Sequence, residues 1–200
     1  MRLNYPVVLA SGSPRRQDLL RTLVESFEIV VSDVDEDALT VDDPFVTAES
    51  LASAKARTVA MIRPDSLVIG GDTVVALPIS GGTYRQFAKP KSAQDACEML
   101  GALSGKTHLV ITGISLVWPG GQTTFSDRTN VTFRSMTANE IAAYVATGIP
   151  MDKAGGYAIQ DGADRFVVRV DGSQSNVIGL PMEKLERTLK ALTRKDGQVS

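Results

Sequence analysis

The chain has 200 residues, of which 43% are hydrophobic and 22% charged, and its formal net charge at pH 7 is −2. This length suits one domain with a substantial core, and the composition is that of a globular protein rather than a disordered one. A nearly balanced charge argues against sequence-independent binding to nucleic acid, so the cations that hold any anionic ligand must be gathered locally.

Cysteine and histidine each occur once, as Cys97 and His108. One cysteine excludes a disulfide within the chain and suits a reducing compartment, and thiol, zinc and Ser-His-Asp chemistries are nearly excluded. We expect Cys97 to be a small buried core residue, and His108 to be a strand residue with a satisfied ring rather than a catalytic base. The sequence shows no long apolar span and no signal peptide, which predicts a cytoplasmic protein without a membrane partner.

The N-terminal segment predicts a strand, a turn of small residues and a helix. Tyr5–Ala10 is an apolar, β-branched run typical of a buried strand, and Ser11-Gly12-Ser13 is a turn. Pro14 suits the first position of the following helix. The N–H groups at that helix N-terminus, with the guanidinium groups of Arg15 and Arg16, predict a cradle for phosphate. For this segment alone, a serine N-cap beside solvated arginines is an equally good interpretation.

Strands and helices alternate in the next part of the chain. The pattern predicts a strand over Phe27–Val31, an acidic loop over 32–37, and a helix that follows Pro44 and Thr47 and runs to about Ile62. A strand over Leu67–Ile69 then leads into Gly70–Val75. We expect Asp72 to leave this strand next to small residues, which would let a ligand approach. A turn at Ser80–Gly82 predicts a hairpin or excursion that returns at Lys89-Pro90-Lys91.

The second half begins with a helix that Ser92 caps and that runs to Leu103. Two long β-rich runs, His108–Trp118 and Gln122–Arg134, flank Pro119-Gly120-Gly121 and predict a hairpin. A capping box over 137–140 begins another helix. After a glycine-rich stretch, the pattern predicts a strand over Phe166–Val170, a polar loop over Ser173–Asn176, a helix from Pro181 and a loose tail over 195–200.

This order of elements predicts an α/β protein with a mixed, twisted sheet and flanking helices, in a single domain over 1–200. The sequence contains neither the G-x-G-x-x-G of a dinucleotide-binding fold nor a P-loop.

Charged residues at turns, at strand ends and, in the case of Lys55, on a helix form a chemically coherent set. Glu36 lies in the acidic loop, Asp72 follows a strand, and Lys55 and Lys89 supply cations outside the first helix. Each signal alone is weak, since acidic loops are usually solvated and a lysine such as Lys55 usually snorkels to the surface. Together, the cations match a triphosphate, and the two carboxylates match a hard divalent ion with a water to be activated.

The chain resembles the Maf family of nucleoside triphosphate pyrophosphatases almost from end to end. The motifs that carry the resemblance occur in the family's order: Leu9-Ala10-Ser11-Gly12-Ser13-Pro14-Arg15-Arg16, Asp33-Val34-Asp35-Glu36, Ala54-Lys55-Ala56, Gly71-Asp72-Thr73-Val74-Val75, Lys89-Pro90, Leu103-Ser104-Gly105, Asp152-Lys153-Ala154-Gly155-Gly156-Tyr157-Ala158-Ile159-Gln160 and Gly179-Leu180-Pro181. Eight ordered motifs are far more specific than any one of them.

The resemblance implies hydrolysis of a nucleoside triphosphate to the monophosphate and pyrophosphate, by water attack at the α-phosphorus with a divalent metal (Mg²⁺, with Mn²⁺ or Co²⁺ as alternatives). It also implies a fold similar to that of the inosine triphosphate pyrophosphatases, with two lobes around a central cleft, and a homodimer. Arg15 and Thr73 resemble the branch that acts on dTTP and UTP.

The resemblance also implies a role for each matching residue. Asp72, Glu36, Lys55 and Lys89 would be catalytic, with Asp72 as the base, and Glu36 and Asp72 would also hold the metal. The residues that would bind substrate are Ser11, Ser13, Arg15, Arg16, Thr73, Asp152, Lys153 and Gln160.

Two other classes of function remain open at this point. A catalytically weak, nucleotide-binding regulator of cell division would bind tightly without forming product. A nucleotidyltransferase would exchange labelled pyrophosphate into nucleotide in the presence of an acceptor. The carboxylate pair argues against a pure binding protein, which gains nothing from a metal-and-water site.

Overall fold

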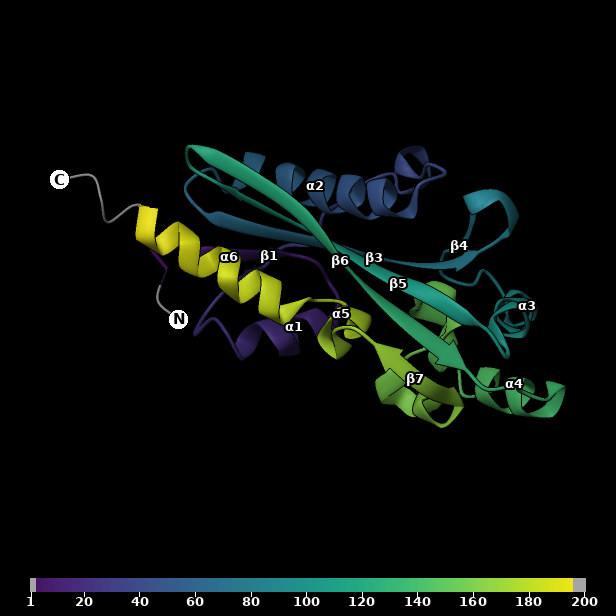
Figure 1. The fold of residues 1–200 in the computed structure, drawn as a ribbon. Coiled ribbons are helices and arrows are strands. Elements are labelled where there is room, and N and C mark those ends of the chain that lie inside the picture. Colours follow the sequence, from purple (N-terminus) through teal and green to yellow (C-terminus); the bar gives the residue numbers. More distant parts are fainter. Residues whose placement is uncertain (1–2, 196–200) are drawn as a thin grey trace.

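Seven strands form one twisted, mixed sheet with helices on both faces in the computed structural model, which describes residues 3–195 (Figure 1). The strands are β1 (Val7–Ala10), β2 (Glu28–Ile29), β3 (Leu67–Pro78), β4 (Tyr84–Phe87), β5 (Thr107–Trp118), β6 (Gly121–Phe133) and β7 (Val167–Asp171). The helices are α1 (Pro14–Arg21), α2 (Pro44–Ile62), α3 (Ala93–Leu103), α4 (Ala138–Val145), α5 (Gln174–Ile178) and α6 (Met182–Lys195). The expected α/β class and mixed sheet are confirmed.

Three long antiparallel strands, β3, β5 and β6, form the middle of the sheet. The sheet order is β2-β1-β3-β5-β6-β7, and β4 also pairs with β3. β1 is parallel to both β2 and β3, whereas the other pairs are antiparallel. β1 pairs with β3 as far as Gly70, and β4 pairs with it from Val75 onward. The segment Gly71–Val74 therefore lies between the two neighbouring strands, where it pairs with β5.

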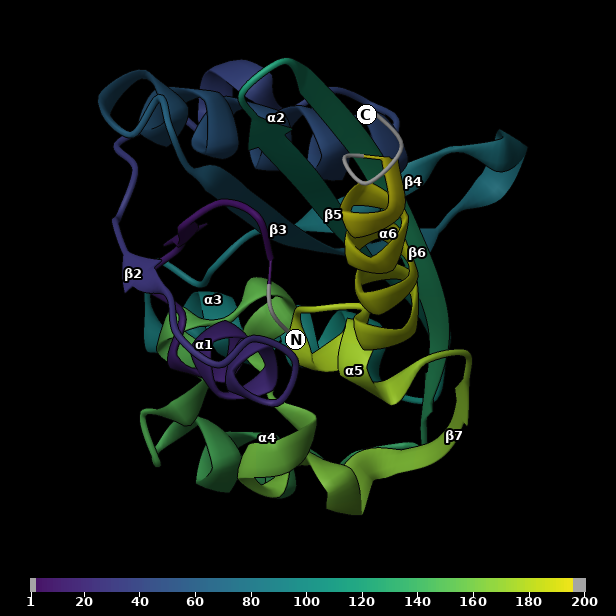
Figure 2. The same ribbon diagram turned by 90° about the vertical axis from the view of Figure 1, so that its left-hand side faces the viewer.

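Two apolar clusters lie at the two ends of these long strands. In one, Ile69 and Ile114 pack against Leu20 of α1 and Leu185 of α6. In the other, side chains of β3, β5 and β6 pack with α3 and α4, including the buried Leu100. Alternate side chains of a strand point to opposite faces, so both clusters use one face of β3. α2 covers the other face, as Figures 1 and 2 show.

Two glycines allow α2 to approach the sheet closely. A Cβ atom on Gly70 would lie 2.3 Å from the carbonyl oxygen of Ala52, and one on Gly113 would lie 2.2 Å from that of Ala48. Such separations are far below van der Waals contact, so a side chain at either position would push the helix away. Since α2 carries Lys55, these glycines also determine how near this lysine lies to β3.

Several predicted elements are confirmed. α2 ends at Ile62 as predicted, although it begins at Pro44 rather than after Thr47. Ser13 and Ser92 cap α1 and α3 with their side chains, and Thr137 begins α4 with a complete capping box. The two hairpins are also present.

Other predictions were wrong or fall elsewhere. The expected polar loop at 173–176 is an N-cap, Ser173, followed by α5. The expected strand over 27–31 is paired only at Glu28–Ile29, and the strand from Leu67 continues to Pro78. Lys195 ends α6, and the predicted tail beyond it lies outside the described residues.

Candidate active site

A cavity of about 380 Å³ lies where β1 leaves the sheet and β4 has not yet joined it. Between Gly70 and Val75 no strand within residues 3–195 pairs with this edge of β3. Residues that point to either face of β3 therefore reach the same cavity. All twelve residues that the sequence suggested for the site line it: Ser11, Ser13, Arg15, Arg16, Glu36, Lys55, Asp72, Thr73, Lys89, Asp152, Lys153 and Gln160. Their shared location is a finding, whereas their individual roles stay predictions.

A lysine bridges the two predicted metal-binding carboxylates. Lys55 Nζ donates to Asp72 Oδ1 and to Glu36 Oε1, both at 2.6 Å. The side chains of Lys55 and Asp72 are 12% and 14% exposed, whereas that of Glu36 is 48% exposed. Burial by itself would raise the pKa of Glu36, but its hydrogen bond with Lys55 and the charges of Lys55, Lys89 and Arg16 lower this pKa overall.

Asp72 was expected where its strand ends, and that expectation was wrong. It lies inside the twelve-residue strand β3, opposite Gly113 of β5. In the sequence, Gly70 and Gly71 resemble the start of a loop, but both belong to β3. Glycine suits these positions because α2 approaches the strand closely at Gly70 and the Arg16 side chain does so at Gly71. A carboxylate in mid-strand is held more firmly than one in a loop, which strengthens the case for Asp72 as a base.

The N-terminus of α1 forms one wall of the cavity. Ser13 accepts a hydrogen bond from the backbone N–H of Arg16 at 3.4 Å, as its N-cap position requires. Arg16 also uses three of its five side-chain N–H groups within the protein: Nε donates to the carbonyl oxygen of Gly179 at 2.9 Å, Nη1 to Ser11 Oγ at 3.1 Å, and Nη2 to Thr73 Oγ1 at 3.0 Å. Arg16 thus joins α1, β3 and the turn after α5, and two donors remain for substrate.

Burial affects the charge of Arg16. Desolvation lowers the pKa of its guanidinium, and the negative charge of Asp72 opposes this effect. A guanidinium remains protonated near neutral pH even so, which leaves a half-buried positive charge beside the cavity.

Lys153, which follows α4 in the chain, adds another cation to the cavity wall. Lys153 is 9% exposed and donates to the carbonyl oxygen of Ile149 and to Asp152, while its Nζ lies 3.9 Å from Asp161 Oδ2. Arg15 Nη1 lies 3.8 Å from the same carboxylate oxygen. Burial opposes ionisation of Asp152, but its contact with Lys153 lowers its pKa overall. The sequence did not single out Asp161, because nothing in its own neighbourhood indicates a contact with α1.

Lys89 and Gln160 are exposed residues of the cavity wall.

Cys97 is only half-buried and packs against the α3–α4 cluster, so its predicted burial is correct only in part. His108 is a buried strand residue, as expected, and its Nε2 lies 2.8 Å from the Tyr157 hydroxyl. Its Nδ1 has no hydrogen-bond partner in the described part of the chain. The expectation that both ring nitrogens are hydrogen-bonded is therefore met only at Nε2. Desolvation lowers the pKa of His108 to about 4.

The donor set fits a hard divalent cation. Glu36 and Asp72 each place an oxygen 2.6 Å from one point, the Lys55 ammonium, so two carboxylates already converge on a site of positive charge. Within residues 3–195 no group of three or more His, Cys, Asp or Glu side chains is arranged to hold a metal. Mg²⁺ commonly binds through one or two carboxylates, waters and substrate phosphates, so the pair suffices.

The fold has a counterpart among solved structures. A HAM1 protein from Coxiella burnetii superposes with a TM-score of 0.52 at 15% identity, covering 94% of this chain and 99% of that one. At this identity the likeness shows the fold alone, and it confirms the expected α/β architecture with helices around a mixed sheet.

The family is shown by sequence. The family model for Maf-like proteins matches residues 6–192, and the chain belongs to that family. A relative named dTTP/UTP pyrophosphatase from Geobacillus sp. (strain WCH70) is 43% identical over 93% of this chain and 97% of its own length. Another relative with the same name, from Bacillus cytotoxicus, is 45% identical over 92% of this chain and 93% of its own length.

The described residues include no helix long and apolar enough to cross a membrane.

Proposed function

We propose that this protein hydrolyses nucleoside triphosphates, with dTTP and UTP as preferred substrates, to the monophosphate and pyrophosphate. The observation that carries the proposal is the convergence, in one cavity, of a carboxylate pair bridged by Lys55 with the N-terminus of α1. The names of the 43–45% identical relatives support the choice of substrate. The triphosphate is the partner this cavity suits, since its walls carry cations from four separate parts of the chain.

Asp72 is the base in this mechanism. Its carboxylate takes a proton from a water molecule, and the water oxygen forms a bond to the α-phosphorus. The bond from that phosphorus to the bridging oxygen breaks, and pyrophosphate leaves with the electron pair. Lys55 and Lys89 offset the charge that develops on the phosphate oxygens, and Arg15 adds a planar donor group. Asp152, Lys153 and Gln160 orient the rest of the substrate.

Glu36 and Asp72 would hold Mg²⁺, or Mn²⁺ or Co²⁺ in its place. When bound, the cation supplies positive charge to the polyphosphate and makes a nearby water easier to deprotonate. Lys55 contacts both of these carboxylates, so its ammonium offsets part of their negative charge within the protein itself.

A homodimer in the cytoplasm completes the proposal. The single cysteine supports a reducing compartment, and the family resemblance supports the dimer. Sedimentation at micromolar concentration tests the dimer directly.

The decisive variant is Asp72→Asn, which keeps the shape of the side chain and removes the base. We expect turnover of dTTP and UTP to fall by at least about a thousandfold while nucleotide binding is largely retained. Asp127→Asn is the matched control. Asp127 lies on β6, where it forms an ion pair with Lys184 of α6, and it does not line the cavity. A near-normal rate in Asp72→Asn contradicts the assignment of the base. Tight binding with no product from the unmodified protein would instead indicate a regulatory nucleotide-binding protein.

A further inference from the structure

The two faces of β3 give the cavity two chemically different ends. Asp72 points toward α2 and Lys55, whereas Thr73 points to the opposite face with Val75. On β5, Thr112 lies opposite Thr73 and Val110 lies opposite Val75. Val75 and Val110 line the cavity, as do the buried Tyr157 and the half-buried Val177. Phosphates suit the charged end, and a flat nucleobase suits this more apolar end, at whose border Thr73 lies.

The hydrogen-bond chain through Thr73 has one consistent direction. Thr112 Oγ1 lies 2.8 Å from the carbonyl oxygen of Asn176, and this contact is attractive only if the Thr112 hydroxyl donates. A hydroxyl has one hydrogen, so Thr112 accepts from Thr73 across their 3.1 Å contact. Thr73 Oγ1 in turn accepts from Arg16 Nη2 at 3.0 Å. The only hydrogen of the Thr73 hydroxyl therefore points away from the cavity, and its remaining lone pair is left for a ligand.

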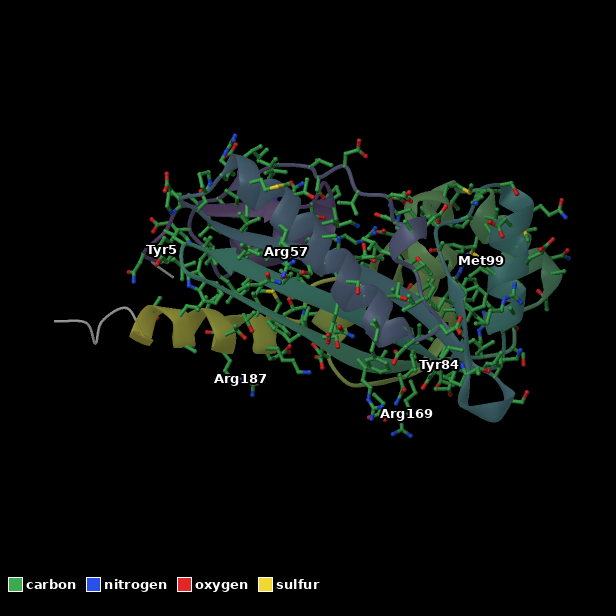
Figure 3. The ribbon with its side chains drawn as sticks, turned by 90° about the horizontal axis from the view of Figure 1, so that it is seen from above. Tyr5, Arg57, Tyr84, Met99, Arg169 and Arg187 are labelled. Carbon is green, nitrogen blue, oxygen red and sulfur yellow. The ribbon has the colours of Figure 1, made fainter. Side chains whose placement is uncertain are left out.

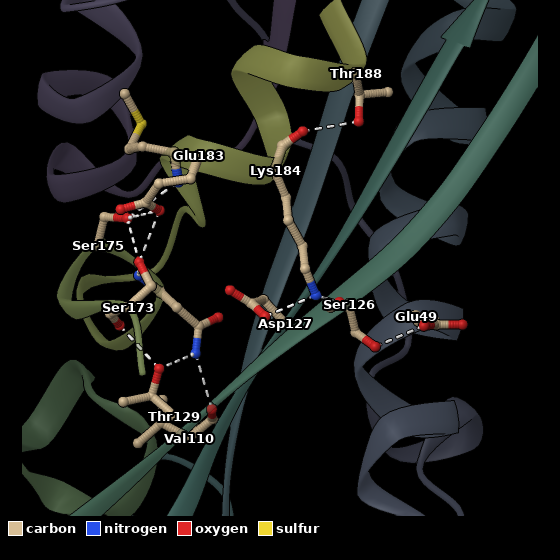
Figure 4. Close-up of polar contacts among 12 residues, drawn as sticks. Glu49, Val110, Ser126, Asp127, Thr129, Ser173, Ser175, Glu183, Lys184 and Thr188 are labelled. Atoms are coloured by element: carbon tan, nitrogen blue, oxygen red, sulfur yellow. Dashed lines mark hydrogen bonds and ion pairs between the residues drawn. The ribbon is translucent and has the colours of Figure 1, made fainter. Parts of the chain in front are cut away.

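Thr112 is held in this arrangement by a buried polar network. Asn176, which is fully buried, donates from Nδ2 to the Val110 carbonyl oxygen at 3.0 Å and to Thr129 Oγ1 at 3.1 Å. Thr129 then donates to the Ser173 carbonyl oxygen at 2.8 Å, and Glu183 accepts from the Ser173 hydroxyl at 2.9 Å (Figure 4). These contacts fix α5 against β5 and β6, so the Asn176 carbonyl that orients Thr112 has a defined position.

We propose that Thr112 is a positioning residue that selects between pyrimidine bases by making Thr73 a pure hydrogen-bond acceptor toward the cavity. Uracil and thymine carry an N3–H donor that matches such an acceptor. Cytosine has a lone pair at N3, which the Thr73 oxygen repels. The inference rests on the proposed function, because it applies to a nucleotide whose base lies at the apolar end of the cavity.

The test compares Thr112→Val, which has the same shape without a hydroxyl, with Thr112→Ser, which keeps the hydroxyl. Pyrophosphate release from UTP and from CTP gives kcat/KM for each, and their ratio does not depend on the fraction of folded enzyme. Ser115→Ala is the matched control, since it removes another buried hydroxyl of β5 that contacts Thr124 on the opposite face of the strand from Thr112.

We expect the unmodified enzyme, Thr112→Ser and Ser115→Ala to prefer UTP, and the preference to fall by about tenfold in Thr112→Val. The reason is that the freed Thr73 hydroxyl can turn toward the cavity and donate to cytosine N3. An equal loss for both nucleotides in Thr112→Val, or an unchanged ratio, overturns the inference while the proposed function stands. Failure of the unmodified enzyme to release pyrophosphate from any triphosphate overturns the proposed function, and the inference with it.

Discussion

Replacing Lys55 with methionine tests whether the bridged carboxylates form a cation site. The change keeps an unbranched side chain of similar length and removes the ammonium that lies 2.6 Å from both Asp72 and Glu36. Loss of one partner of a fully buried ion pair costs 3–5 kcal/mol. Asp72 is 14% exposed and Glu36 is 48% exposed, so water solvates part of the exposed charge and we expect a loss of about 2–3 kcal/mol.

The assay is thermal unfolding at pH 7.5 in EDTA and in Mg²⁺. For a chain of this size the predicted loss lowers Tm by about 5–10 °C in EDTA. The two unpaired carboxylates should then bind Mg²⁺ more tightly than the native pair, and a tenfold excess over Kd restores about 1.4 kcal/mol. Arg57→Met is the control, because Arg57 is an exposed cation of the same helix (Figure 3) that hydrogen-bonds Gln122.

Two results would refute this reasoning. If Lys55→Met unfolds in EDTA at the same temperature as the unmodified protein, the bridge contributes nothing to stability. If Mg²⁺ raises Tm by the same amount in both proteins, Glu36 and Asp72 do not hold the cation.

Two more variants probe groups beside the cavity. Burial lowers the pKa of His108 to about 4, so as the pH falls this histidine takes up a proton in the unfolded chain before it does in the native protein. The free energy of unfolding should therefore fall by about 2 kcal/mol between pH 7.5 and 5. His108→Gln should remove this part of the pH dependence in urea unfolding, and identical slopes for both proteins would contradict the assignment. Asp161→Asn removes the carboxylate near Arg15 and Lys153, so KM for UTP should fall by about two- to fivefold; a higher KM would mean that Asp161 helps to bind substrate.

Local patterns predicted the helices and most of the strands well. Ser13 before Pro14, and Thr137 three residues before Glu140, are caps whose hydrogen bonds form within one turn, so the sequence alone indicates them. The short helix α5 was missed because its five residues are too few to show a periodic pattern, and tertiary contacts of Asn176 hold it in place.

The location of the site was predictable, but its internal contacts were not. The twelve residues that the motifs indicated all line one cavity: most lie in strands, in turns or near the start of α1, and Lys55 lies within α2. The pairing of Arg16 with Gly179, 163 positions away, depends on how α5 packs against the sheet. The same holds for Asp161, whose contact with Arg15 joins two segments that lie far apart in the sequence. Such contacts depend on the tertiary arrangement, which local spacing does not encode.

Hydrolysis of UTP in ¹⁸O-labelled water, with mass analysis of both products, tests the central claim most directly. Attack of water at the α-phosphorus places the label in the nucleoside monophosphate and leaves pyrophosphate unlabelled, and this is the result we predict for the unmodified enzyme. Label in pyrophosphate, or release of orthophosphate with a nucleoside diphosphate, would place the attack at another phosphorus and contradict the role given to Asp72.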